Sequence, residues 1–218
     1  YSVEYYLEGS ATPFDTLEKQ SVLVATPEVK TVADSKKVPA GYKRSTTDPE
    51  LPTTITSSNN VIKVYYKVDE KQKLDYSVEY YLEGSATPFD TLEKQSVLVA
   101  TPEVKTVADS KKVPAGYVRS TTAPELPTTI TSSNNVIKVY YVADEKQKLD
   151  YSVEYYLEGS ATPFDTLEKQ SVLVATPEVK TVADSKKVPA GYVRSTTAPE
   201  LPTTITPSNN VIKVYYVA

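Results

Sequence analysis

The first residues of the chain alternate between hydrophobic and polar side chains with the two-residue period of a β-strand. In residues 2–8, Val3, Tyr5 and Leu7 take every second position, and Ser, Glu, Tyr and Glu take the others. Successive side chains of a strand point to opposite faces of its sheet. The pattern therefore predicts a strand with one buried and one exposed face.

The alternation returns in residues 61–66. Ile62, Val64 and Tyr66 are predicted on one face of this strand, and Lys63 and Tyr65 on the other. The β-like residues 53–56 lie just upstream, separated from the strand by a Ser-Ser-Asn-Asn segment whose asparagines are favoured in turns. We therefore predict a hairpin between residues 53–56 and 61–66.

The middle of the pattern is less regular. Residues 21–25 and 42–45 have the composition of further strands, and the proline-rich residues 46–52 that of a loop. Residues 26–33 fit the start of a helix, because they open with Thr-Pro, but their β-branched alternation favours a strand followed by a short turn at 34–37. The residues alone thus indicate an α+β or nearly all-β domain with about five strands.

The whole pattern occurs three times. The segment Tyr-Ser-Val-Glu-Tyr-Tyr-Leu-Glu-Gly begins at Tyr1, Tyr76 and Tyr151, which gives a period of 75 residues. The second copy differs from the first at four positions, and the third differs from the second only at Pro207, where the second has Ser132. Solenoid repeats are shorter, at roughly 20 to 50 residues, so this period indicates domains that fold independently.

The expected domains are residues 1–68, 76–143 and 151–218, with linkers at 69–75 and 144–150. The first linker is charged and has neither Gly nor Pro, unlike a flexible tether or a proline-rich spacer. We therefore expect the last strand of one copy to run almost straight into the next copy, with Leu74 packing at the junction. This predicts an elongated, beads-on-a-string array.

Composition excludes most catalytic chemistry. The chain has no Cys and no His, which removes thiolates, the commonest zinc ligands and the commonest general base. Asp69, Glu70 and Asp75 are candidates for a calcium site at the junction, but the neighbouring lysines and the lack of EF-hand spacing favour a solvated linker. We predict no enzyme, no catalytic residue, no metal site and no cofactor.

Charge and hydropathy limit the partners. The net charge of −4 is spread over mixed lysines and acidic residues, which favours neither nucleic acid nor an anionic membrane. No apolar run approaches the ~18 residues of a membrane span. The chain begins inside the repeat without a signal peptide, so we expect a monomeric fragment of a longer protein that does not insert into a membrane.

Three segments of each copy resemble the MucBP-like repeats of Gram-positive surface proteins. They are the opening Tyr-Ser-Val-Glu-Tyr-Tyr-Leu-Glu-Gly, the central Ala40-Gly41-Tyr42, and the closing stretch from Ile55 to Tyr66 with its Asn-Asn-Val-Ile-Lys-Val-Tyr-Tyr. The resemblance implies a β-grasp, ubiquitin-like domain and a place in cell-wall-anchored adhesins, some of which bind mucin or other host glycans. The expected fold class is then α+β and β-rich, as three tandem β-grasp domains.

A tyrosine surface is the one candidate binding site. If the first and last strands of a copy lie parallel and adjacent, as the resemblance implies, Glu4 faces Lys63 and Tyr6 faces Tyr65 on the outer side of the sheet. Exposed tyrosines suit stacking on sugar rings, although cross-strand tyrosine pairs also stabilise a sheet by themselves. The candidate glycan-contact residues are Tyr6, Tyr65, Tyr81, Tyr140, Tyr156 and Tyr215.

The repeats, the composition and the resemblance are compatible with two functions. The leading expectation is a semi-rigid stalk that projects an adhesive domain from the cell surface, outside the cell. The alternative is that each copy is a weak module for mucin or host or matrix glycans, and that repetition increases avidity by raising the effective concentration.

Overall fold

The structure, a computed structural model, describes residues 1–218 and contains eighteen β-strands and no helix. The expected α+β class is therefore wrong, and the protein is all-β. Residues 26–33, the one helix candidate, instead contain strand β3 (Glu28–Val29). Val29 is only 4% exposed and joins the core through this extended segment, in keeping with the β-branched residues around it.

Each copy forms six strands. In the first copy they are β1 (Ser2–Leu7), β2 (Asp15–Leu17), β3 (Glu28–Val29), β4 (Tyr42–Arg44), β5 (Thr53–Thr54) and β6 (Val61–Val68). In the second they are β7 (Lys73–Leu82), β8 (Asp90–Leu98), β9 (Glu103–Val104), β10 (Tyr117–Arg119), β11 (Thr128–Thr129) and β12 (Val136–Ala143). In the third they are β13 (Lys148–Leu157), β14 (Asp165–Leu173), β15 (Glu178–Val179), β16 (Val193–Arg194), β17 (Thr203–Thr204) and β18 (Val211–Val217).

The chain divides into two compact units, and the division passes through the middle copy. One unit consists of residues 1–78, 92–107 and 125–137, and the other of residues 79–91, 108–124 and 138–218. Each unit therefore holds one complete copy together with part of the middle copy.

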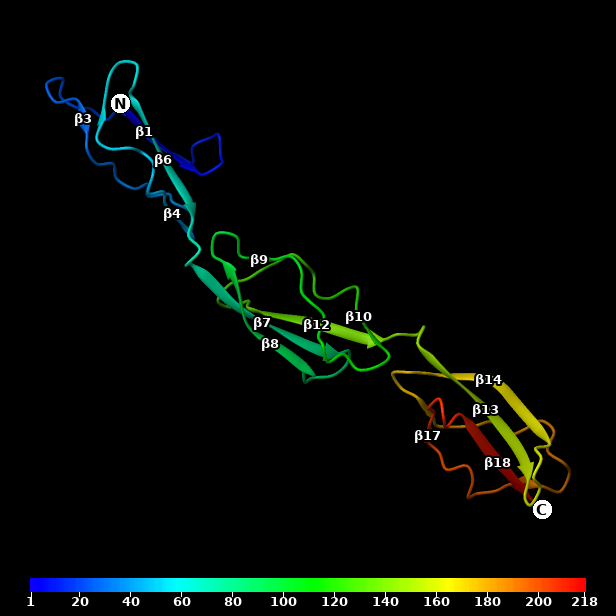
Figure 1. The fold of residues 1–218 in the computed structure, drawn as a ribbon. Coiled ribbons are helices and arrows are strands. Elements are labelled where there is room, and N and C mark those ends of the chain that lie inside the picture. The colour runs from blue at the N-terminus through cyan, green and yellow to red at the C-terminus, as the bar shows by residue number, and fades with distance from the viewer. The chain divides into compact units, whose positions relative to one another are not determined.

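The first copy is built on a four-stranded sheet with the order β2-β1-β6-β4, of which β1, β6 and β4 are labelled in Figure 1. Its first and last strands, β1 and β6, are parallel and central, while β2 and β4 pair antiparallel at the edges. The expected parallel pairing of the first and last strands is confirmed. Glu4 lies opposite Lys63, and Tyr6 lies opposite Tyr65. The third copy repeats this order as β14-β13-β18-β16.

The ubiquitin-like β-grasp expectation is corrected together with the fold class, because that fold packs a helix across its sheet and this chain has none. In the first copy the segment between β2 and β4 instead contributes β3, which pairs with β5 in a separate two-stranded sheet. Val29 of β3 and Ile55, next to β5, pack into the core. Short extended segments thus take the place of the expected helix.

The predicted hairpin between residues 53–56 and 61–66 does not form. Both edges of β6 are already occupied by β1 and β4, so residues 53–54 pair with β3 instead. The Ser-Ser-Asn-Asn segment still makes a turn, because Thr56 and Asn59 exchange backbone hydrogen bonds of 3.0 and 3.3 Å. The asparagine turn is as predicted, but it joins strands of two different sheets.

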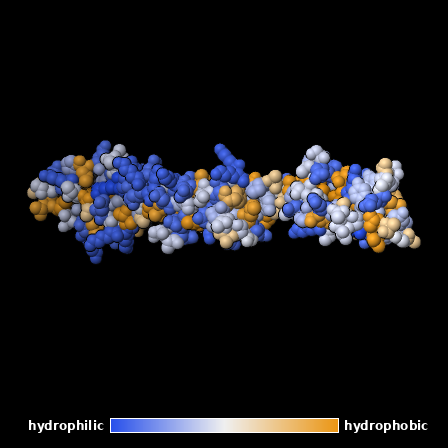
Figure 2. All heavy atoms as spheres, turned by 90° about the horizontal axis from the view of Figure 1, so that it is seen from below, coloured by the Kyte–Doolittle hydropathy of each residue, from blue (hydrophilic) through white to orange (hydrophobic).

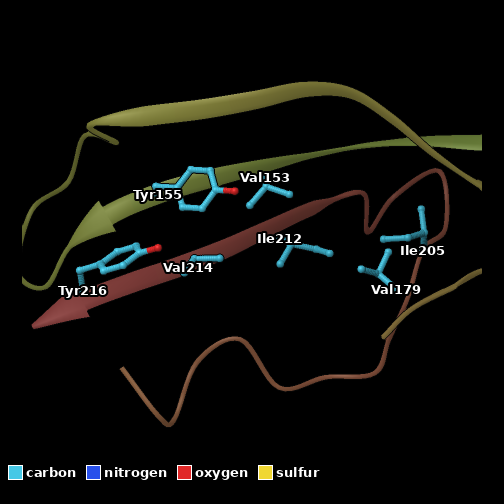
Figure 3. Packing of buried hydrophobic residues seen from close by; sticks show 7 residues of the cluster. All are labelled: Val153, Tyr155, Val179, Ile205, Ile212, Val214 and Tyr216. Atoms are coloured by element: carbon cyan, nitrogen blue, oxygen red, sulfur yellow. The ribbon is translucent and has the colours of Figure 1, made fainter. Parts of the chain in front are cut away.

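The hydrophobic core of the third copy lies on one face of β13 and β18 (Figure 3). The rings of Tyr155 and Tyr216 point into it, and both residues are 2% exposed. Phe164 meets Tyr216 edge to face, with 5.7 Å between ring centroids. The buried members of this cluster are Val153, Tyr155, Val179, Ile205, Ile212, Val214 and Tyr216.

The strand predicted at residues 21–25 is absent from the first copy, although the equivalent residues of the third copy form part of a strand. In the first copy β2 ends at Leu17, whereas the identical sequence in the third copy continues as β14 to Leu173. The difference arises upstream, because Lys148, Leu149 and Asp150 extend β13 and pair with the far end of β14.

The junction between the first two copies is a four-residue turn. Its backbone turns at Asp69, where Gln72 N donates to Asp69 O over 3.2 Å. The Asp69 carboxylate accepts hydrogen bonds from Gln72 Nε2 and Lys71 N at 3.0 and 3.1 Å, and these bonds lower the pKa of Asp69. Strand β7 begins immediately afterwards, at Lys73. Leu149, the third-copy equivalent of Leu74, packs against that copy's core.

Candidate functional site

The candidate tyrosine surface lies on the face of the main sheet opposite the core. Val3 and Tyr5 point into the core from β1, so Glu4 and Tyr6 point outward. The register between β1 and β6 places Tyr65 directly beside Tyr6. The two rings are stacked, with centroids 5.3 Å apart and an interplanar angle of 22°.

Most of the surface of Tyr6 is covered by its neighbours. The residue is only 7% exposed, although it lies on the outer face. Its hydroxyl donates to Glu4 Oε1 over 2.7 Å, and Lys63 Nζ lies 5.6 Å from its ring centroid. Tyr65 is half-buried and Lys63 is exposed. A ligand approaching this face would therefore meet Tyr65 and Lys63 before Tyr6.

All six predicted tyrosines form such pairs, one pair in each copy. Tyr81 stacks on Tyr140 and Tyr156 on Tyr215, each with centroids 5.3 Å apart. The residues equivalent to Tyr6 are again 7% exposed. The face and the pairing follow the expectation, whereas contact with a glycan stays a prediction.

The hydrogen bond to Glu4 changes the acidity of Tyr6. Ionisation of the phenol would remove this hydrogen bond and place a negative charge beside the Glu4 carboxylate. The hydrogen bond is the larger cause and burial the smaller one, and together they raise the pKa of Tyr6 from its ordinary value near 10 to about 12. The same causes raise the pKa of Tyr81 and of Tyr156 to about 12. The folded state thus favours the protonated phenol. This stabilisation is complete below about pH 10 and is lost as the pH rises through about 12.

Replacing the three glutamates, Glu4→Gln, Glu79→Gln and Glu154→Gln, is expected to lower the pKa of one tyrosine per copy. Glutamine keeps an acceptor oxygen but removes the negative charge that opposes ionisation. An alkaline titration followed by tyrosinate absorbance should show these phenols ionising at lower pH than in the parent protein. Superimposable titration curves for the two proteins would contradict the assigned hydrogen bond.

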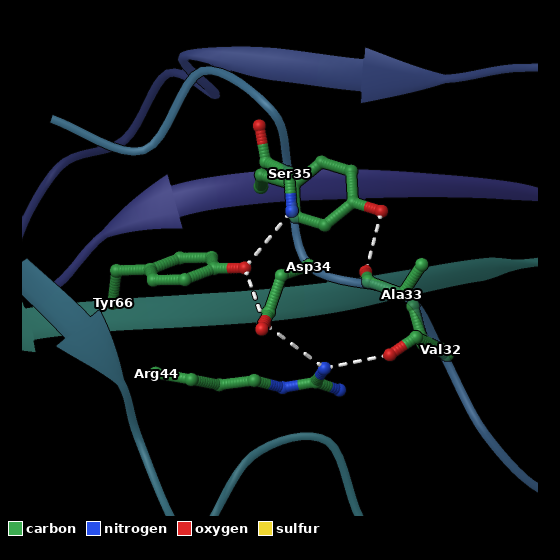
Figure 4. A network of polar contacts seen from close by, with 7 residues as sticks. Val32, Ala33, Asp34, Ser35, Arg44 and Tyr66 are labelled. Carbon is green, nitrogen blue, oxygen red and sulfur yellow. Dashed lines mark hydrogen bonds and ion pairs between the residues drawn. The ribbon is translucent and has the colours of Figure 1, made fainter.

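A second polar cluster joins the core to the segment before β4 (Figure 4). Tyr66 Oη donates to Asp34 Oδ1 over 2.8 Å and accepts from Ser35 N over 3.1 Å. Arg44 Nη1 donates to Val32 O at 2.7 Å and contacts Asp34 at 3.3 Å. The cluster fastens residues 32–35, which have no regular structure, to the last strand.

Sequence reasoning missed this cluster, because its partners are far apart in the chain: Tyr66 lies 31 positions from Ser35, and Arg44 lies 12 positions from Val32. Ser35 also donates to Asp15 Oδ2 over 2.5 Å, and this bond is the main cause of the lowered pKa of Asp15. The Ser35 oxygen in turn accepts from Lys37 N at 2.9 Å. These contacts close the loop onto β2 and serve as structural ties.

The structure contains no group of three or more acidic, His or Cys side chains placed to hold a metal ion. The two Asp69 oxygens of the calcium candidate accept hydrogen bonds from the protein's own turn. No helix is present that could cross a lipid bilayer. On the face drawn in Figure 2, hydrophobic atoms lie in small patches among hydrophilic ones.

No protein-family model matches the chain, and no curated protein is significantly similar to it.

Proposed function

We propose that this chain is a structural repeat region, a semi-rigid stalk that projects an adhesive domain of a bacterial cell-surface protein. The observation that carries the proposal is the combination of near-identical copies with a short, hydrogen-bonded turn between them. The first and third copies, each of which lies within a single compact unit, have buried cores of their own. Only residues 69–72 separate β6 from β7.

Repetition of one nearly identical module suits a spacer. Copies that differ at so few positions present the same surface again and again, so adding copies changes length and little else. In the turn at residues 69–72, the Asp69 carboxylate accepts hydrogen bonds from Lys71 N and Gln72 Nε2. These bonds make the turn stiffer than a Gly/Ser linker. The resemblance to MucBP-like repeats supports an extracellular, cell-wall-anchored location as part of the same proposal.

Small-angle scattering of the chain in solution tests the stalk. Size scaling gives a radius of gyration of roughly 17 Å for one globule of this length and roughly 50 Å for an unfolded chain. The same scaling gives domains about 30 Å across, and three such domains placed in line have a radius of gyration of about 30 Å. We expect a value near 30 Å with a rod-like distance distribution. A value near 17 Å would mean that the copies fold onto one another, and the stalk would be abandoned.

A second function, weak binding of mucin or other glycans by each copy, is supported by the repeated tyrosine pair. Tyr65 is half-buried beside the exposed Lys63, and the arrangement recurs at the same register in the third copy. Binding of the parent chain to immobilised mucin, lost in a Tyr65→Ala, Tyr140→Ala, Tyr215→Ala variant, would favour this function. Equal binding by both proteins would exclude the tyrosine surface as the contact.

A further inference from the structure

The tight turn Leu-Val-Ala-Thr, here called the hairpin tip, has the same sequence in all three copies but different surroundings. It consists of residues 23–26, 98–101 and 173–176. In the first copy Leu23 and Val24 are 72% and 96% exposed. The equivalent residues of the second copy, Leu98 and Val99, are half-buried. Since the sequences are identical, something outside the copy covers the second tip.

The covering surface is the turn before β4 of the preceding copy. Gly41 is buried, has a φ of +87°, and lies so close to the tip that a Cβ on it would overlap Ala100 N and come within 2.8 Å of Ala100 Cα. Residues 1–78 and 92–107 belong to the same compact unit. Gly191, the third-copy equivalent, is exposed, and a Cβ added to it would have no neighbouring atom within 4 Å.

Backbone hydrogen bonds connect the two sides of this contact. Asp69 N donates to Gly41 O at 2.8 Å, Gln72 N to Asp69 O at 3.2 Å, and Val99 N to Gln72 O at 2.9 Å. The same three-bond path runs from Gly116 through Asp144 and Gln147 to Val174 in the other unit. Gly116 is likewise buried against Ala175.

We infer that the Gly41-type turn is a docking site whose partner is the hairpin tip of the next copy, so that neighbouring copies restrain each other. The site fits this partner because glycine has no Cβ and adopts a positive φ without strain, which lets the Val-Ala tip approach its backbone. Nearest-neighbour coupling of this kind makes the stability and motion of one copy depend on the next. The inference holds whether or not the repeats form a stalk.

A matched pair of variants tests the docking. Gly116→Ala and Gly191→Ala place the same strained residue at φ +85° and +87°, but only the first would collide with a neighbouring tip. The chain has no cysteine, so nitroxide labels attach only at introduced positions, here Ser85→Cys and Ser160→Cys, which are equivalent exposed positions of the second and third copies within one compact unit. Pulsed electron paramagnetic resonance then reports the spread of distances between these two copies.

We expect a narrow distance distribution in the labelled parent and in Gly191→Ala, and a clearly broader one in Gly116→Ala. Equal widths in all three proteins would overturn the docking site. Equal broadening by both glycine variants would also overturn it, because the cause would then be strain within a copy.

A second variant decides the matter if Gly116→Ala unfolds its own copy. Ala175→Asp places a charge on the docked tip and is expected to broaden the same distribution. Ala25→Asp makes the same change on the exposed first tip and shows whether aspartate there harms the copy itself. A folded Ala175→Asp protein with a narrow distribution would refute the inference.

Discussion

Aspartate in place of Val214 is expected to unfold the third copy, whereas aspartate in place of Val211 on the same strand leaves it folded. Val214 has no exposed surface, and Val211 is 41% exposed. A carboxylate at position 214 would be buried among apolar side chains without a partner, which costs several kcal/mol even after the protein relaxes. A small domain has only about 5–15 kcal/mol of stability to lose, and a copy of this size lies at the low end.

Differential scanning calorimetry of the full chain measures this effect. In Val214→Asp we expect the unfolding heat of the third copy to disappear, while the other copies still unfold cooperatively, the second at a lower temperature because its Gly116 turn loses the docked tip. Val211→Asp should keep the parent profile, because substitutions at exposed sites usually change stability by no more than about 0.5 kcal/mol. A parent-like profile for Val214→Asp would mean that β18 does not bury this position.

The second large effect is expected at Tyr216, whose ring and hydroxyl contribute separately to the free energy of unfolding of the third copy. Tyr216→Ala removes a ring that is 2% exposed and packs on Tyr155 and Phe164, so the third copy should lose about 3–5 kcal/mol. Tyr216→Phe keeps the ring but leaves the buried Ser185 N–H without its acceptor, which should cost about 1–3 kcal/mol.

Chemical denaturation followed by circular dichroism ranks these variants, with Tyr215→Phe as the control. Tyr215 precedes Tyr216 on the same strand but is half-buried on the outer face. Its change should cost less than about 0.5 kcal/mol. If Tyr216→Phe were as stable as the control, the hydroxyl would not fasten Ser185. The third-copy counterpart of the cluster drawn in Figure 4 would then lose its assigned role.

The central sheet of each copy could be predicted because its signal is local. The alternation at Val3, Tyr5 and Leu7 and that at Ile62 and Val64 predict which side chains of β1 and β6 face the core. Val3, Tyr5, Ile62 and Val64 are buried there, and Leu7 packs against the core but is only partly buried. The outward positions of Tyr6 and Tyr65 follow from the same period. Their pairing required the expected parallel arrangement in addition.

The remaining errors come from interactions that no local pattern encodes. The Ser-Ser-Asn-Asn turn was recognisable from its residues. Whether β5 pairs with β3 or with β6 depends on which edges of β6 are free, and the local sequence does not show this. Residues 21–25 were predicted as a strand, yet whether their sequence pairs depends on residues that precede the copy. Similarly, the 7% exposure of Tyr6 results from neighbours across the sheet.

The four-residue turn at Asp69 also bears on how tandem copies avoid pairing with the wrong strand. Residues 76–82 of β7 have the same sequence as residues 1–7, so they compete for the place of β1 beside β6. Parallel neighbours need a crossover of a dozen or more residues, and only residues 69–72 separate β6 from β7. The shortness of the turn thus keeps the nearest identical strand from replacing the correct one, and each copy closes on its own first strand.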